Sequence, residues 1–120
     1  MINIVNIKNK PVPYYDDYIG RGNKWLGLNE SKWGNPFIMK KESERNGVLI
    51  AYCKHILSSP ELIASLSELE NRTLGCYCVP KICHGNVLIA LYEEIVINKT
   101  VPESLLTDVE GFLTNKNLLK

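Results

Sequence analysis

The sequence has little excess charge of either sign and no long hydrophobic run. Its 120 residues include 14 Lys and Arg and 13 Asp and Glu, which gives a formal net charge of +1. Duplex nucleic acid and anionic membranes therefore gain no bulk attraction, and a small ligand is the better expectation. No apolar run reaches the roughly 18 residues of a membrane span, and the opening MINIVNIKNK lacks the hydrophobic core of a signal peptide. These absences predict a cytoplasmic protein without membrane contact.

Cysteine is also scarce, and no repeat, low-complexity tract or linker interrupts the chain. The four cysteines are Cys53, Cys76, Cys78 and Cys83. In the cytoplasm such residues usually stay as thiols, metal ligands or catalytic groups, so we do not expect a disulfide framework. A length of 120 residues is enough for a core of its own. The sequence therefore predicts a single domain over residues 1–120.

Hydrophobic spacing predicts short strands and several helices. Apolar and β-branched runs predict strands at 2–7, 18–19 and 73–78. Spacings of three and four predict helices at 42–57, 60–70, 85–97 and 101–113, and we expect the tail 114–120 to fray. This order indicates an α/β fold, a small sheet with helices packed on it. The last helix has an apolar stripe that we expect to cover the core, although a dimer seam there would make a homo-oligomer: Leu105, Leu106, Val109 and Phe112.

Three cysteines and a histidine are concentrated in residues 74–88, LGCYCVPKICHGNVL, where a strand leads into a helix. Side chains two apart on a strand share a face, so Cys76 and Cys78 should point together, while Cys83 and His84 come at the helix start. One interpretation is a zinc site formed by these four side chains. Its spacing is unusual, because adjacent Cys83 and His84 can hardly both bind one ion.

Two other chemical interpretations of this segment stay open. Cys83 could be a reactive thiolate with His84 as its base, since a helix N-terminus lowers a thiol pKa. Alternatively, His84, Gly85 and the free N–H groups of the helix could hold a phosphate or ribose, with Gly85 leaving room for the ligand. The purely structural alternative makes Cys76 and Cys78 small buried hydrophobic residues and His84 a helix cap.

A second motif lies in the long loop that we expect over residues 14–36. Gly20-Arg21-Gly22 places a guanidinium between two flexible residues, where it could bind phosphate as a bidentate donor. Trp25 and Trp33 either stack on a base or belong to the core. Gly34-Asn35-Pro36 fixes a turn in which the Asn35 side chain bonds backbone or ligand. Glycine, arginine, asparagine and aromatic residues together favour a nucleotide-binding pocket over a metal site.

Together, YIGRGNKW, SKWGNPF and LGCYCVPKICHGNVL resemble a family of small domains of unknown function, DUF4326, that is common in bacteriophages and bacteria. The resemblance covers about residues 2–92 and leaves a C-terminal helical extension, about 101–113, outside. In the compact form of the family the first motif runs almost directly into the second, whereas residues 23–30 intervene here. The resemblance implies a Rossmann-like sheet, a nucleotide-associated site and a phage or mobile-element context.

We therefore expect a nucleotide-binding protein that needs no cofactor and sequesters a nucleotide-derived signal, of the cyclic dinucleotide or ADP-ribose type, as an anti-defence sponge. If phage-encoded, it would act in the host cytoplasm. The expected ligand-binding residues come from both motifs: Gly20, Arg21, Gly22, Lys24, Trp33, Asn35, Cys78, His84 and Gly85.

Two alternatives to this function remain. An enzyme would cleave or transfer at a glycosidic or phosphate bond of a nucleotide, with Cys83 or His84 as its catalytic group and Asp16 or Asp17 assisting. A zinc-stabilised module would bind a host protein through the Cys-rich segment.

Overall fold

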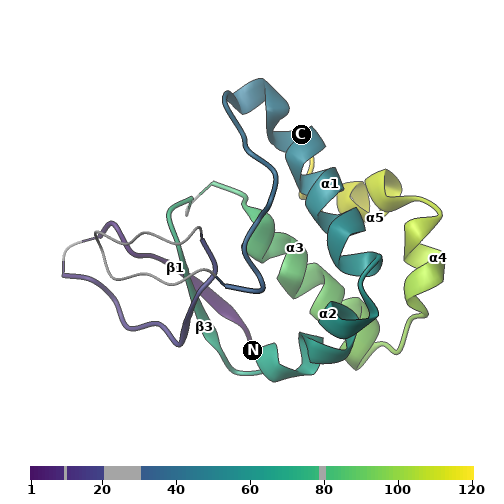
Figure 1. Cartoon of the computed structure of the whole chain (residues 1–120), viewed down its shortest axis with the longest axis horizontal. Coiled ribbons are helices and arrows are strands. Elements are labelled where there is room, and N and C mark those ends of the chain that lie inside the picture. Colours follow the sequence, from purple (N-terminus) through teal and green to yellow (C-terminus); the bar gives the residue numbers. More distant parts are fainter. Residues whose placement is uncertain (10, 21–30, 79–80) are drawn as a thin grey trace.

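A computed structural model describes residues 1–9, 11–20, 31–78 and 81–120 of the chain. It is a compact α/β domain, with a small sheet on one side and the helices gathered on the other in the view of Figure 1. Within the described residues, no helix is long and apolar enough to cross a membrane.

Three parallel strands form the sheet in the order β1-β3-β2. Their bounds are Asn3–Asn6 for β1, Asp17–Tyr18 for β2 and Thr73–Cys76 for β3. All three predicted strands are confirmed, although β3 ends at Cys76, earlier than expected. Leu74, Gly75 and Cys76 are buried because β3 is the central strand.

The helices follow the predicted order. A short 3-10 turn over Glu42–Glu44 leads into α1, and a π-helical turn over Tyr92–Ile97 continues α3. Another 3-10 turn, Leu66–Leu69, continues α2. The α-helices are α1 (Arg45–Leu57), α2 (Pro60–Ser65), α3 (His84–Leu91), α4 (Pro102–Leu106) and α5 (Val109–Asn115). Ser59 caps α2, because its hydroxyl accepts a hydrogen bond from the Leu62 N–H at 3.3 Å.

The predicted single helix over 101–113 is wrong, because the chain forms two helices there. Asp108 lies between α4 and α5 and caps α5: its Oδ1 accepts from the Gly111 N–H at 3.0 Å. A strong N-cap starts a new helix instead of extending the previous one. Both helices pack against α1, and three residues of the predicted stripe, Leu105, Val109 and Phe112, pack in or against the core, whereas Leu106 is exposed.

The prediction that residues 114–120 fray is also wrong. The α5 helix extends to Asn115, and Leu118 and Leu119 pack against the core. The side chain of Asn46 donates to the Lys120 carbonyl at 2.8 Å and accepts from the Lys120 N–H at 3.2 Å. These two bonds hold the C-terminus beside the start of α1, where Figure 1 shows it.

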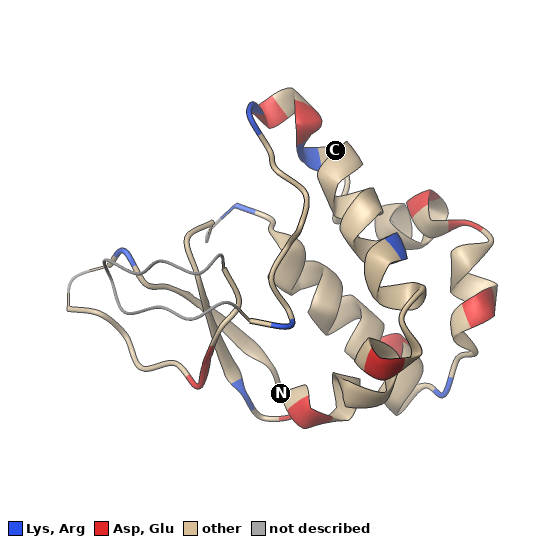
Figure 2. Ribbon diagram, viewed as in Figure 1, with Lys and Arg blue, Asp and Glu red and all other residues tan. Residues whose placement is uncertain are grey.

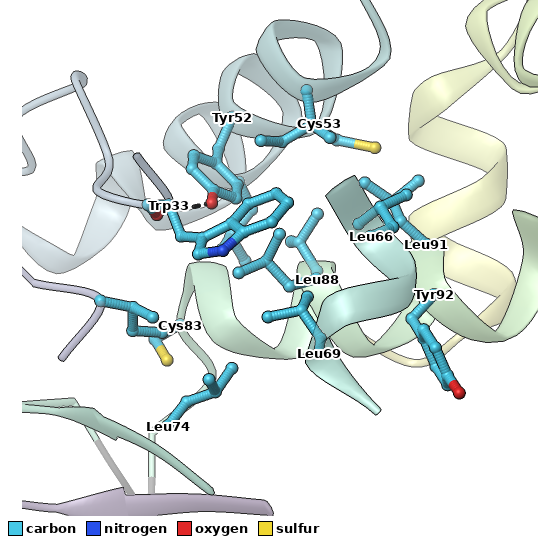
Figure 3. Packing of buried hydrophobic residues seen from close by; sticks show 14 of the residues in the cluster. Trp33, Tyr52, Cys53, Leu66, Leu69, Leu74, Cys83, Leu88, Leu91 and Tyr92 are labelled. Carbon is cyan, nitrogen blue, oxygen red and sulfur yellow. Dashed lines mark hydrogen bonds between the residues drawn. The ribbon is translucent and has the colours of Figure 1, made fainter. Parts of the chain in front are cut away.

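The core lies between α1, α3 and the sheet, and Figure 3 shows part of it. Trp33 is only 3% exposed, and its carbonyl accepts a hydrogen bond from the Tyr52 hydroxyl at 2.7 Å. This bond ties the 31–36 segment to α1 and satisfies the buried phenol. Trp33 is therefore a core residue.

Gly75 in the central strand gives a direct test of this packing. A Cβ there would lie 2.8 Å from Ile7 Cγ2 and 3.0 Å from Cγ of the Tyr15 ring. We expect Gly75→Ala to lower the free energy of unfolding by about 1–3 kcal/mol, because the buried site has no room for a methyl group. Urea denaturation followed by circular dichroism measures the change.

Gly47→Ala is the matched control, since a Cβ at exposed Gly47 in α1 meets no other atom within 4 Å. This substitution should raise stability by up to about 1 kcal/mol, because alanine favours helix over glycine. An unchanged stability for Gly75→Ala would mean that Ile7 and Tyr15 do not cover the strand.

Candidate functional site

A pocket of about 420 Å³ lies at the carboxyl ends of β2 and β3, between the starts of α1 and α3. Ligands of open parallel sheets bind at this edge. Four parts of the chain line it: the residues around β2, the turn after Trp33, the first turns of α1, and the segment from β3 to α3. The lining residues are Tyr18, Gly20, Asn35, Phe37, Met39, Arg45, Val48, Leu49, Cys76, Tyr77, Cys78, Cys83 and His84.

Much of the pocket wall is aromatic. The rings of Tyr18 and Tyr77 meet edge to face, with centroids 6.1 Å apart and planes at 82°. The Lys8 ammonium lies 5.3 Å from the centroid of the Tyr77 ring. A Cβ at Gly20 would overlap the Tyr18 phenol as it is placed here, so a larger residue at this position would displace that ring. Flat rings beside a cation suit a planar ligand that carries negative charge.

The turn after Trp33 brings Asn35 to the pocket lining. The Asn35 Oδ1 accepts from the Phe37 N–H at 2.9 Å, and the Gly34 N–H donates to the Ser31 carbonyl at 2.9 Å. These bonds fix the turn. The other half of the Asn35 carboxamide, Nδ2, is a hydrogen-bond donor.

His84 lines the pocket, but its chemistry differs from that expected of an anion ligand. Its Nε2 lies 2.7 Å from the Ile19 carbonyl, so this nitrogen carries the proton and donates it there. Burial lowers the pKa of the imidazole, which also packs 4.9 Å from the Tyr52 ring. A neutral imidazole in this tautomer keeps only Nδ1, an acceptor. His84 therefore suits a ligand O–H or N–H better than a phosphate.

Gly85 has a packing role instead of the expected ligand contact, and we correct that prediction. It is buried, and a Cβ there would lie 2.9 Å from both Ile4 Cδ1 and Ile19 Cδ1. The absent side chain thus lets α3 approach the sheet closely. At the helix start, the Cys83 N–H donates to Asn86 Oδ1 and the Asn86 N–H to the Cys83 carbonyl, both at 2.9 Å. These amides are therefore already bonded within the chain.

Three thiols meet at the floor of the pocket. Cys76 Sγ and Cys83 Sγ are 3.7 Å apart, and Cys83 also shares a hydrogen bond with Cys78. Cys76 and Cys83 are buried, whereas Cys78 is half-buried. The prediction that Cys76 and Cys78 share one strand face fails, because β3 ends before Cys78.

The structure corrects which thiol is activated. The hydrogen bond from Cys83 and the nearby Arg45 guanidinium hold the pKa of Cys78 at about 7. Hydrogen bonds to Cys76 and Cys78, together with burial, raise the pKa of Cys83. Cys83 is therefore a protonated donor at neutral pH. The sequence prediction relied on the position of Cys83 at a helix start, which lowers a thiol pKa. Burial and a neighbouring thiolate outweigh that effect here.

Arg45 is the site residue that sequence reasoning missed. Its guanidinium binds both carboxylate oxygens of Glu42, at 2.8 and 2.7 Å, and donates to the Ile82 carbonyl. Lys81 also reaches Glu42, at 3.1 Å, and the two cations lower the pKa of Glu42 to about 2. Figure 2 shows acidic and basic residues side by side at this turn before α1. The available signal was Glu42 three residues before an arginine at a helix start.

The remaining predicted residues divide into three groups. Trp33 is buried in the core and does not line the pocket, which corrects its predicted ligand contact. Arg21, Gly22 and Lys24 lie outside the described residues. Asp16 and Asp17 are at the opposite end of the sheet: Asp16 accepts from the Thr73 N–H at 2.7 Å, and Asp17 is 3.5 Å from Arg72. Neither carboxylate lines the pocket.

The zinc interpretation gains no support from the geometry. Among the residues that the structure describes, no group of three or more His, Cys, Asp or Glu side chains is arranged to hold a metal ion. The proton of His84 is directed to the Ile19 carbonyl, and the thiols bond with one another.

Comparison with known proteins decides the family. The model for Domain of unknown function (DUF4326) matches residues 2–94. The chain belongs to the DUF4326 family. Among its relatives is an uncharacterized protein, R718, of Acanthamoeba polyphaga mimivirus, which is 41% identical over 105 residues and is aligned over 79% of this chain and 80% of its own length. No solved structure matches the chain significantly. The predicted resemblance is thus confirmed.

The altered thiol pKa leads to a measurable pH dependence for this DUF4326 chain. Alkylation of Cys78 by iodoacetamide should rise with pH around a midpoint of about 7, because the thiolate is the reacting form. Cys53, whose pKa is raised to about 12 by burial, should stay unmodified in the folded protein. Peptide mapping by mass spectrometry after short reactions gives both rates.

Arg45→Gln should move the Cys78 midpoint upward, because the variant loses a cation that stabilises the thiolate, provided that circular dichroism confirms its fold. Preferential modification of Cys83 would contradict the assignment.

Proposed function

We propose that the pocket binds a small nucleotide-derived ligand. The observation that carries this proposal is an aromatic-lined pocket at the carboxyl ends of parallel strands, with few polar groups converging on it. A volume of about 420 Å³ is in the range of small-molecule and cofactor sites. We further propose that the sheet is Rossmann-like in this respect, since Rossmann-like sheets hold nucleotides at the same edge.

Each kind of lining residue has a counterpart in such a ligand. The faces of Tyr18, Tyr77 and Phe37 can stack on a base. The Asn35 carboxamide and the His84 imidazole supply a donor and an acceptor, which suit base edges or ribose hydroxyls. Lys8, which does not itself line the pocket, provides positive charge beside Tyr77. We assign phosphate contacts to Arg21 and Lys24, which come one and four positions after Gly20 in the sequence.

We propose that the protein binds this ligand in order to sequester it. A sponge for a cyclic dinucleotide or an ADP-ribose derivative needs a pocket but no catalytic base, and Asp16 and Asp17 lie at the far end of the sheet. A relative encoded by a virus supports a setting in which a host signal is withdrawn.

One observation favours an enzyme as the second candidate. Cys78 offers a thiolate inside the pocket, near the positive charge of Arg45. Such a group could attack a glycosidic carbon or a phosphorus atom of the bound ligand. In this alternative Cys78 takes the role that the sequence gave to Cys83.

Calorimetry tests binding directly. The full chain is titrated with ADP-ribose, NAD and cyclic dinucleotides, and at least one should bind. Val48→Trp fills the pocket with a larger side chain, and Arg21→Ala removes the assigned phosphate ligand. Each should weaken binding by about tenfold or more. Lys54→Ala, an exposed change on α1 away from the pocket lining, should bind as the parent does. No heat with any ligand of the panel would refute the proposal.

The fate of the ligand separates the two candidates. After incubation, the protein is denatured and the ligand is analysed by mass spectrometry. An intact ligand supports sequestration. A changed mass that is lost in Cys78→Ser would establish the enzyme instead.

A further inference from the structure

The three pocket thiols, Cys76, Cys78 and Cys83, differ in their exposure. Neither ligand binding nor sequestration depends on this difference. Cys78 is half-buried on the pocket wall, so a small molecule that enters the pocket can reach it. Cys83 is 2% exposed and lines the same pocket as Cys78, while its Sγ is 3.7 Å from that of Cys76. An accessible thiol beside a protected one is the arrangement in which oxidation of the first is completed by the second.

We propose that Cys78 and Cys83 form a peroxide-reactive pair, in which Cys78 is oxidised and Cys83 resolves it to a disulfide across the pocket floor. The co-reactant is a hydroperoxide, of which hydrogen peroxide is the smallest. This inference does not depend on the identity, or the binding, of a nucleotide-derived ligand.

The first step oxidises Cys78 by two electrons. The Cys78 thiolate attacks one oxygen of the peroxide, the O–O bond breaks, and the sulfur becomes a sulfenic acid. The other oxygen leaves as hydroxide and takes a proton to become water. Arg45 favours this step because its charge stabilises the reacting thiolate. Its guanidinium is held in place by Glu42 and by the Ile82 carbonyl.

The second step joins the two sulfurs. Cys83 loses its proton and attacks the Cys78 sulfur, the S–O bond breaks, and the released hydroxide combines with that proton to form water. Cys83 is held protonated partly by the thiol groups around it, and oxidation of Cys78 removes the nearby thiolate. The Gly85 N–H, which bonds to Cys83, then favours the Cys83 thiolate. Cys83 is thus ready to react once Cys78 has been oxidised.

Formation of this disulfide would change the pocket itself. The thiolate near Arg45 disappears, so the site loses its nucleophile and a negative charge. Reduction by a cellular dithiol restores both. Oxidation would therefore switch the chemistry that the pocket presents to any ligand.

Mass spectrometry of the full chain tests the pair. Reduced protein, dialysed against EDTA and checked for metal content, is treated with hydrogen peroxide and then with N-ethylmaleimide. Non-reducing peptide mapping should find a Cys78–Cys83 disulfide. In Cys78→Ser no disulfide should form at this site, and in Cys83→Ala the Cys78 sulfenic acid should persist and be captured by dimedone. Cys53→Ser is the matched control and should behave as the parent.

Two results would overturn the proposal. A Cys76–Cys83 disulfide that also forms in Cys78→Ser would make Cys78 a bystander. Resistance of wild-type Cys78 at peroxide concentrations that oxidise unfolded chain would show that the site is not reactive. Both results come from peptide mapping, either of the wild-type protein or of the conservative variant Cys78→Ser. Circular dichroism confirms that each variant is folded.

Discussion

Close packing of the start of α3 against the sheet is the contact on which the rest of the site depends. Gly85 leaves no side chain between the helix and Ile4 and Ile19. The adjacent His84 donates to the Ile19 carbonyl at 2.7 Å. Because β2 has only two residues, this bond contributes strongly to fixing its carboxyl end. Gly20, the next residue, is thereby placed at the pocket. A larger residue at 85 or a charged imidazole at 84 would disturb both the helix contact and the pocket edge.

Arg45 makes the second connection, between α1 and the segment before α3. A cation at a helix N-terminus is disfavoured by the helix dipole, so its position needs compensation. Glu42 supplies a carboxylate in bidentate contact, and the Ile82 carbonyl accepts a third hydrogen bond. Arg45 as a whole is 9% exposed, and its guanidinium lies near Cys78. Arg45 therefore does more than join α1 to the segment before α3. Because it is mostly buried, its positive charge also acts on the Cys78 thiol in the pocket.

Local signals in the sequence predicted the order of elements well. Hydrophobic periodicity located the helices, and β-branched or apolar runs located the strands. Errors arose where tertiary context decides. Asp108 reads equally well as a helix residue or a cap, and the order of the tail depends on Asn46, which is far away in sequence. The pocket was predictable in outline because parallel strands end at one edge, whereas Arg45 was not, because its role requires the fold to bring Cys78 to it.

The two motifs that identify the family combine residues with different tasks. Trp33 and Gly85 build the core and the helix contact, while Asn35 and Cys78 face the pocket. One motif therefore combines residues that build the fold with residues that line the pocket. The cysteines make the same point physically. Cys53 and Cys78 are the same residue type, yet burial raises the pKa of Cys53 to about 12, whereas the hydrogen bond from Cys83 and the nearby Arg45 guanidinium lower the pKa of Cys78 to about 7. Spacing in the sequence brings thiols together, but the surrounding charges and burial determine which of them can react.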